Sequence, residues 1–222
     1  MKQRSNKSIQ TRSRIYESAI ALFQSKGFNE STMREIAKEA KISLGLTYYH
    51  FKSKEEIVLE FYKNTQTESL MQCKEYFAKE KSLKPRLQFL LEQKLNQFEP
   101  YANFLHILAS SAGDPSNPLS PFSEETKEIR ESAIQIFSLA IEDIGEKIPD
   151  DLKTSLPEIL WFYQMGIIYY WLTDRSEKKS KSYKLVDASL ELLMQLLRIS
   201  KLPFMKGVRK KIIDIYNSIT QK

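Results

Sequence analysis

Residues 43–56, SLGLTYYHFKSKEE, gather side chains that can bind phosphate and read base edges. Tyrosine hydroxyls, an imidazole and lysine ammonium groups all donate hydrogen bonds to phosphate oxygens. Ser43 is suited to cap a short helix over 44–50, whose free N-terminal amides also attract phosphate. This composition favours the binding of a polyanion such as a nucleic acid.

The alternative is that the tyrosines belong to the core and that the lysines are only solvated. Tyr48, Tyr49 and His50 follow one another in the predicted helix. Successive helix positions point about 100° apart, so three consecutive bulky residues cannot all be buried in so short a helix. Part of this face must therefore meet solvent or a partner.

The preceding elements predict how this helix is held. An amphipathic helix over 7–26 stops at Gly27, and Thr32 with Glu35 fits a capping box that opens a second helix over 33–40. Ser53 with Glu56 predicts another capping box, which opens a fourth helix. Two short helices joined by a tight turn are the plan of a helix-turn-helix, whose second helix enters the DNA major groove.

The charge distribution is compatible with that reading. Residues 1–54 hold 11 Lys/Arg against 4 Asp/Glu, whereas residues 55–222 hold 23 against 24. A basic head on a neutral body suits DNA, because neutralising phosphates supplies most of the sequence-independent affinity. A solvated basic tail would give the same count, and charge alone leaves both readings open.

The segment 14–58, RIYESAIALFQSKGFNESTMREIAKEAKISLGLTYYHFKSKEEIV, closely resembles the N-terminal domain of the TetR family of bacterial transcriptional regulators. The resemblance rests on A..LF..KGF in the first helix, T.REIAKEA in the second and S.G..YYHFKSKE in the third. It implies a three-helix DNA-binding head, a helical body that binds ligand and dimerises, and repression released by a small molecule.

The resemblance also implies roles for individual residues. Phosphate contacts are expected from Thr32, Tyr49, His50 and Lys54, with Lys52 at the edge. The face that looks into the groove comprises Ser43, Leu44, Gly45, Leu46 and Tyr48. A basic arm with Lys2, Arg4, Lys7 and Arg12 either reaches the DNA or is a solvated tail.

The chain departs from the family pattern at two places. Lys41 stands in the turn where glycine is usual, which predicts a strained or an alternative backbone geometry there, at a cost of order 1 kcal/mol. Thr47 stands where an aliphatic residue packs inward, and Leu46 where a small or polar residue faces DNA. Leu46 is therefore expected to touch a thymine methyl group.

The apolar spacing predicts an all-α protein, with a DNA-binding domain over 1–53 and a ligand-binding and dimerisation domain over 54–222. The helices expected after residue 53 span 54–80, 84–98, 101–112, 121–146, 155–173, 183–200 and 204–220. The last of them is an additional amphipathic helix that either folds back over the bundle or binds a partner.

Aromatic residues are abundant in the predicted body, and they suit either an ordinary core or an apolar cavity for a small hydrophobic ligand. The candidate lining residues are Phe89, Phe104, His106, Trp161, Tyr163, Gln164 and Tyr169. Fatty acyl derivatives, aromatic compounds and drug-like cations all fit such a cavity. The lack of acidic residues between Glu158 and Asp174 disfavours cations there.

Dimerisation is expected from the symmetry of palindromic operators, which a two-fold homodimer matches. The helices over 155–173 and 183–200 are expected to pair with their copies as a four-helix bundle, as in the family. The candidate seam comprises Leu185, Ala188, Leu192, Leu196 and Ile199. Packing of the same face within one chain is the alternative.

The function favoured is a ligand-responsive repressor that binds double-stranded DNA; the alternative is a ligand-independent regulator or an activator that uses a protein partner. Catalysis is disfavoured, since the sequence holds no nucleophile with a neighbouring base and no glycine-rich phosphate loop.

Cys73 is the only cysteine, and no spacing resembles a metal site, so neither a disulfide nor a cofactor is expected. The basic, polar N-terminus and the absence of a long apolar run predict a cytoplasmic protein without a membrane span.

Overall fold

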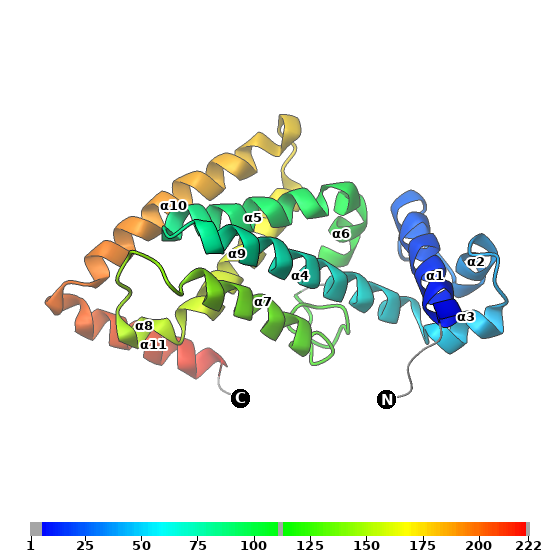
Figure 1. Cartoon of the computed structure of the whole chain (residues 1–222), viewed down its shortest axis with the longest axis horizontal. Helices are drawn as coiled ribbons and strands as arrows, with labels where there is room; N and C mark the ends of the chain where they lie inside the picture. The colour runs from blue at the N-terminus through cyan, green and yellow to red at the C-terminus, as the bar shows by residue number, and fades with distance from the viewer. Residues whose placement is uncertain (1–5, 111–112, 221–222) are drawn as a thin grey trace. The chain divides into compact units, whose positions relative to one another are not determined.

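The structure is a computed structural model that describes residues 6–110 and 113–220. All regular structure in these ranges is helical, as predicted (Figure 1). The chain divides into two compact units: a head unit, Met1–Thr65 with Phe98–Arg130, and a body unit, Gln66–Gln97 with Glu131–Lys222. The functional boundary expected at residue 53 remains a prediction.

The head unit begins with three helices whose bounds match the predicted ones within a residue. Two further helices, α4 and α7, are shared between the two units. The elements of the head unit are α1 (Asn6–Ser25), α2 (Met33–Glu39), α3 (Leu44–His50), the first half of α4 (Lys54–Lys79), the 3-10 turn η1 (Glu99–Tyr101), α6 (Ala102–Ala109) and the start of α7 (Lys127–Ala140). Helix α2 packs against both α1 and α3 (Figure 1).

The core of the head unit is aromatic. Phe61 of α4 meets the rings of Tyr101 and Phe104 edge to face, at centroid distances of 4.9 and 5.9 Å. Phe104 in turn stacks on Phe23 of α1, which meets Phe28 edge to face. Aromatic pairs in these geometries add stability beyond the area they bury. They tie α6 to α1 and to the start of α4.

The body unit contains the second half of α4, the greater part of α7 and the helices that lie wholly or almost wholly within it. These last are α5 (Leu83–Phe98), α8 (Asp150–Lys153), α9 (Leu156–Thr173), η2 (Glu177–Lys179), α10 (Ser180–Ser200), η3 (Pro203–Met205) and α11 (Lys206–Thr220). Helices α10 and α11 meet at a sharp bend (Figure 1). Arg209 fixes α11 to the rest of the unit, because its Nε donates to Asp151 of α8 at 2.9 Å.

A buried arginine joins the ends of two body helices. Arg86 is 2% exposed, and its guanidinium donates to the carbonyl oxygens of Phe77 and Glu80 at 2.7 Å and of Ala140 at 3.2 Å. The last carbonyl groups of a helix have no partner within that helix. Arg86 therefore satisfies the ends of α4 and α7 with one side chain.

Both boundaries expected for α7 were wrong. Helix α7 was expected over 121–146 but spans Lys127–Ala140. Side-chain hydrogen bonds hold the preceding residues in turns, among them that from Thr126 Oγ1 to the Ser120 carbonyl at 2.7 Å. After α7, Asp143 adopts a left-handed conformation with φ of 47°, which an α-helix does not accommodate.

The capping box expected at Ser53 and Glu56 is only half formed. The Glu56 amide donates to Ser53 Oγ at 3.3 Å, but the Glu56 carboxylate accepts from the Lys52 amide at 2.6 Å rather than from Ser53. Across the described ranges, no helix is long and apolar enough to cross a membrane.

Candidate nucleic-acid interface

Helix α2 begins at a complete capping box, as its sequence predicts. The Glu35 amide donates to Thr32 Oγ1 at 3.2 Å, and the Thr32 amide donates to Glu35 Oε2 at 2.9 Å. Lys26, and then Thr32, stabilise the charged carboxylate and hold the pKa of Glu35 at about 2. The Thr32 side chain thus fixes the start of α2 while it remains exposed to solvent.

The turn between α2 and α3 is a Schellman motif with lysine in the left-handed position. The Ile42 amide donates to the Ala37 carbonyl at 2.9 Å, and the Lys41 amide donates to the Lys38 carbonyl at 3.1 Å. Lys41 has φ of 54°, where glycine would carry no Cβ penalty. The strained non-glycine turn predicted from the sequence is confirmed.

Helix α3 is capped and anchored through its inward face. Ser43 Oγ accepts from the Leu46 amide at 3.3 Å, and Thr47 Oγ1 donates to the Ser43 carbonyl at 3.1 Å. Thr47 is 0% exposed, so a threonine occupies the inward position and satisfies its hydroxyl within its own helix. Phe51, directly after α3, is buried as well.

The opposite face of α3 is open. Leu46, Tyr48 and Tyr49 are 43%, 44% and 72% exposed, although large apolar and aromatic side chains are usually buried. Gly45 and Lys52 are exposed on the same segment, whereas Leu44 is half-buried. A Cβ built on Gly45 would meet no atom within 4 Å, so the packing of the chain does not require glycine there.

Two predicted phosphate contacts are engaged within the head unit. His50 is 7% exposed, and its ring meets that of Tyr49 edge to face. Lys54 Nζ donates to the carbonyl of Phe28 at 2.7 Å and lies 4.6 Å from the centre of the Phe28 ring. Both residues thus make contacts within the head unit, and the DNA contacts expected of them remain predictions.

Arg12 is a structural residue rather than part of a free arm. It lies within α1, its guanidinium carbon is 3.8 Å from the centre of the Phe51 ring, and it hydrogen-bonds Glu60 and the His50 carbonyl. It therefore joins α1 to the end of α3 and to α4. Lys7 is exposed at the start of α1, while Lys2 and Arg4 lie outside the described residues.

Sequence reasoning missed two exposed cations on α2. Arg34 and Lys38 both point to solvent from the short helix that precedes the turn, as Lys41 does from the turn itself. They are four residues apart on α2, and this spacing places two helix residues on one face. That signal was available in the sequence.

The seven expected ligand residues are divided between the two units of the described structure. In the head unit, Phe104 is a core residue and His106 is exposed. In the body unit, Trp161 is buried, Tyr163 shares a hydrogen bond of 2.6 Å with Ser189, and Tyr169 is 61% exposed.

The other two expected ligand residues, Phe89 and Gln164, have different settings within the body unit. Phe89 lines an open groove. Gln164 is buried, and its Nε2 has no hydrogen-bond partner among the described residues.

The expected dimer seam lies open on α10. Leu185, Leu192, Leu196 and Ile199 are between 38% and 55% exposed, and Ala188 is exposed too. In the described chain these side chains therefore do not pack into the core. Between them, Val186 and Leu190 are fully buried and hold α10 to the body unit.

Comparisons with known proteins agree with this architecture. The profile described as "Bacterial regulatory proteins, tetR family" matches residues 15–61. The profile described as "Tetracyclin repressor-like, C-terminal domain" matches residues 86–217, which is more than half of the chain.

Two curated relatives come from Bacillus subtilis. The uncharacterised HTH-type transcriptional regulator YerO is 36% identical over 110 residues, or 47% of this chain and 37% of YerO. The probable HTH-type transcriptional regulator YttP is 43% identical over 58 residues, or 24% of this chain and 28% of YttP. The chain thus matches only about a third of the length of these relatives.

Solved structures share the fold at low sequence identity. The transcriptional regulator FadR from Bacillus subtilis, in complex with stearoyl-CoA, has a TM-score of 0.61 and 17% identity, covering 82% of this chain and 96% of FadR. A TetR-family regulator from Pectobacterium atrosepticum has a TM-score of 0.65 and 14% identity, covering 88% of this chain and 97% of that chain. With a family profile that matches most of its length, this chain belongs to the TetR family of bacterial regulatory proteins.

Proposed function

We propose that the protein is a ligand-responsive DNA-binding transcriptional regulator that acts as a homodimer, with one α3 helix of each copy in a major groove. The observation that carries this proposal is the two-sided character of α3. Its inward face is fixed through Thr47, whereas Gly45, Leu46, Tyr48 and Tyr49 project outward without cover. A recognition helix needs this combination of a rigid seat and an open face.

The open face supplies both kinds of contact that a DNA reader needs. Gly45 lets the backbone approach the duplex, while Leu46 offers methyl groups to a thymine methyl. Tyr48 is proposed to contact bases, and Tyr49 and Lys52 to contact phosphate. Ser43 and Thr32 lie at helix starts, where free amides favour phosphate oxygens.

A ligand inside the body unit is supported by two buried donors. Gln164 Nε2 and Trp171 Nε1 lie on the buried face of α9, and neither has a hydrogen-bond partner among the described residues. Buried donors of this kind are rare in folded proteins. A mostly hydrophobic ligand would satisfy both donors if it carried a hydrogen-bond acceptor such as a carboxyl or thioester group. The stearoyl-CoA held by FadR belongs to that chemical class.

Homodimerisation is supported by the exposed seam on α10. An apolar stripe of this kind is unusual on a monomer and typical of an interaction site. Pairing of α9 and α10 with their copies would cover it as a four-helix bundle. The two-fold axis of that bundle would match a palindromic operator.

The proposed switch acts through α4, which follows α3 directly and is one continuous helix, Lys54–Lys79. Ligand in the body would shift this helix and change the separation of the two recognition helices, because a rigid duplex tolerates little change in spacing. Release from DNA on ligand binding makes repression the favoured mode.

One observation favours the alternative, a regulator that acts through a protein partner. Phe204, just before α11, is 74% exposed, and Val208, Ile212 and Ile215 on α11 are between 45% and 61% exposed. Arg209 bonds Asp151 of α8, while the apolar stripe of α11 remains exposed. Such a stripe suits a partner helix.

The proposal is tested by measuring the affinity of purified protein for duplex DNA, using Tyr49→Ala and, as a control, Met71→Ala. The two side chains are 72% and 68% exposed, but only Tyr49 lies on α3. We expect Tyr49→Ala to weaken binding about tenfold and Met71→Ala to have no effect, since one lost charge-assisted contact is worth about 1.5 kcal/mol. Equal affinities for all three proteins would overturn the assignment of α3.

The sensor part has its own test. Compounds are screened for those that raise the melting temperature of the protein, and operator affinity is then measured with each of them. We expect at least one such compound to lower the affinity. If none of them changes it, the ligand-independent alternative holds.

A further inference from the structure

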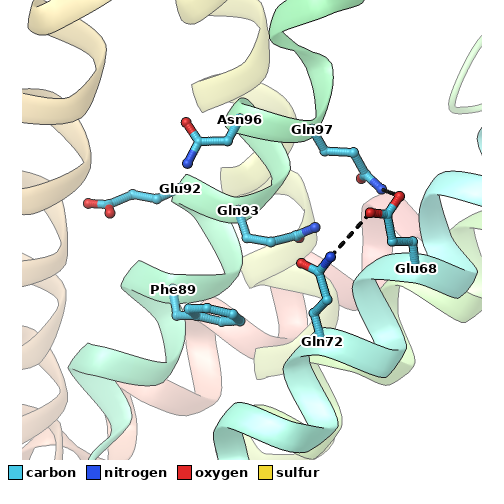
Figure 2. A pocket seen from close by; sticks show the side chains of 7 residues that line it. All are labelled: Glu68, Gln72, Phe89, Glu92, Gln93, Asn96 and Gln97. Carbon is cyan, nitrogen blue, oxygen red and sulfur yellow. Dashed lines mark hydrogen bonds between the residues drawn. The ribbon is translucent and has the colours of Figure 1, made fainter.

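An open groove of about 420 Å³ lies in the body unit between the second half of α4 and α5 (Figure 2). One aromatic ring, two carboxylates and four amides line it. The lining residues are Glu68, Gln72, Phe89, Glu92, Gln93, Asn96 and Gln97. This composition differs from the apolar interior proposed above for a hydrophobic ligand.

The two carboxylates of the groove accept hydrogen bonds mainly from neutral amide groups. Glu68 accepts from the Nε2 atoms of Gln72 at 3.1 Å and Gln97 at 2.7 Å (Figure 2). Glu92 accepts from Gln88 Nε2 at 2.9 Å. Among the described residues no ion pair involves either carboxylate, whereas Lys84 pairs with two acidic residues of α10. The groove therefore attracts a cation.

The remaining lining groups suit an organic cation rather than a metal ion. Phe89 is held in place by parallel stacking on Tyr76, with centroids 4.1 Å apart, and aromatic faces attract ammonium groups. Amide oxygens such as that of Gln72, whose Nε2 donates to Glu68, accept hydrogen bonds from N–H donors. No group of three or more acidic, histidine or cysteine side chains suited to a metal ion occurs within residues 6–110 and 113–220.

We propose that this groove binds a small aliphatic diamine or polyamine, with its ammonium groups at Glu68 and Glu92 and its methylene chain against Phe89. Figure 2 shows the two carboxylates toward opposite sides of the groove, with Gln93 between them. A ligand with an ammonium group at each end offers one charge to each carboxylate. The site goes beyond the proposed regulator function and does not depend on it.

A buried lysine next to the groove should make ligand binding depend on pH. Lys94 is 2% exposed, and its Nζ donates to Gln97 Oε1 at 2.9 Å. Burial lowers the pKa of Lys94 to about 7, against the opposing influence of Cys73 and Glu68, the titratable groups of α4 that face it. A ligand ammonium at Glu68 would repel the Lys94 ammonium. Ligand affinity should therefore rise as Lys94 loses its proton between pH 6 and pH 8.

The test uses the full chain, isothermal titration calorimetry and two probes of equal length, 1,4-diaminobutane and 1,4-butanediol, with spermidine as a longer amine. We expect saturable binding of the amines and none of the diol. Glu68→Gln and Glu92→Gln each should weaken amine binding at least tenfold. Because glutamine keeps the shape and the acceptor oxygen, both variants should fold, which circular dichroism verifies.

The matched control is Glu75→Gln, which removes the same charge from the exposed side of α4, where Glu75 pairs with Lys79. Its amine affinity should equal that of the wild type. Equal losses in all three variants would show unspecific attraction to a negative surface and overturn the site, as would the absence of saturable binding. Phe89→Leu, which keeps the groove apolar but removes the ring, should weaken binding several-fold. DNA affinity is measured separately, so the two proposals fail independently.

Discussion

The ring of Phe104 in α6 stacks on the ring of Phe23 in α1, with centroids 5.5 Å apart and the planes 23° apart. Both side chains are 1% exposed. The contact makes α6 a structural part of the unit that carries α3. Phe104, which was expected to line a ligand cavity, thus packs in the core of the unit that carries the proposed DNA-binding helix.

Replacing Phe104 should therefore destabilise the head unit. Phe104→Ala is expected to lower the free energy of unfolding by about 3–5 kcal/mol, because it leaves a cavity in a closely packed aromatic core. Urea denaturation followed by tyrosine and tryptophan fluorescence measures the loss. His106→Ala, on the exposed side of the same helix, is the control and should change stability by no more than about 0.5 kcal/mol. Similar small effects of both variants would contradict this role.

Gly45→Ala should separate stability from DNA binding. Alanine is favoured over glycine in a helix by about 0.5–1 kcal/mol, and a Cβ at Gly45 meets no atom of the described residues within 4 Å, so the protein should become slightly more stable. A methyl group on the open face of α3 should nevertheless hinder close approach to the duplex. We expect DNA affinity to fall while the melting temperature rises.

Gly207→Ala provides the matched control. Gly207 is the second residue of α11, as Gly45 is of α3, and a Cβ there also meets nothing within 4 Å. This variant should gain similar stability and keep full DNA affinity. A drop in affinity with Gly207→Ala as well would mean that the effect does not arise at the recognition helix.

The turn at Lys41 can be relieved of its strain. Lys41→Gly should raise the free energy of unfolding by about 1 kcal/mol, because a left-handed residue with a Cβ costs about 1–2 kcal/mol. Lys41→Ala removes the same charge but keeps the Cβ, so thermal or chemical denaturation should show no comparable gain. If both variants were equally stable, the strain at φ of 54° would not be the cause.

Lys94 should make stability depend on pH. Its pKa is about 7 in the folded chain against an ordinary 10.5, so above pH 7 the unfolded chain binds more protons and the free energy of unfolding rises with pH. The expected gain is about 2 kcal/mol between pH 7 and pH 9. Above that, Cys73, with its pKa raised to about 12, acts in the opposite direction. Urea denaturation across this range measures the slope.

Lys94→Met should abolish the rise, since it removes the buried ionisable group. Lys74→Met, at an exposed position of α4, is the control and should keep the wild-type slope. A slope that persists in Lys94→Met would assign the titration to another group.

The sequence predicted the helices of the head unit well, because local signals define them. The capping residues Thr32 and Ser43, the stop at Gly27 and the inward Thr47 all act over a few residues, and each was found where expected. Helix α7 was predicted too long, since the turns before it depend on a network around Thr126 that no periodicity reveals.

The site residues were harder to predict, because they depend on contacts between distant segments. Arg12 and Lys54 look like free cations in the sequence, but Arg12 bonds Glu60 and Lys54 bonds the Phe28 carbonyl. All lining residues of the groove between α4 and α5 except Phe89 are polar, and an amphipathic pattern assigns such residues to the solvent face. Only the folded chain brings Glu68 and Gln97 together.

The central claim, that α3 reads a specific palindrome, is tested most directly by selecting bound sequences from random duplex DNA with purified protein at moderate salt. We predict enrichment of an inverted repeat whose half-sites are centred about one DNA turn apart or more, roughly 10 base pairs or above. With Leu46→Ala, the preference should change at one base pair in each half-site. A selection that enriches no palindrome, or an unchanged preference with Leu46→Ala, would contradict the role of α3 as described.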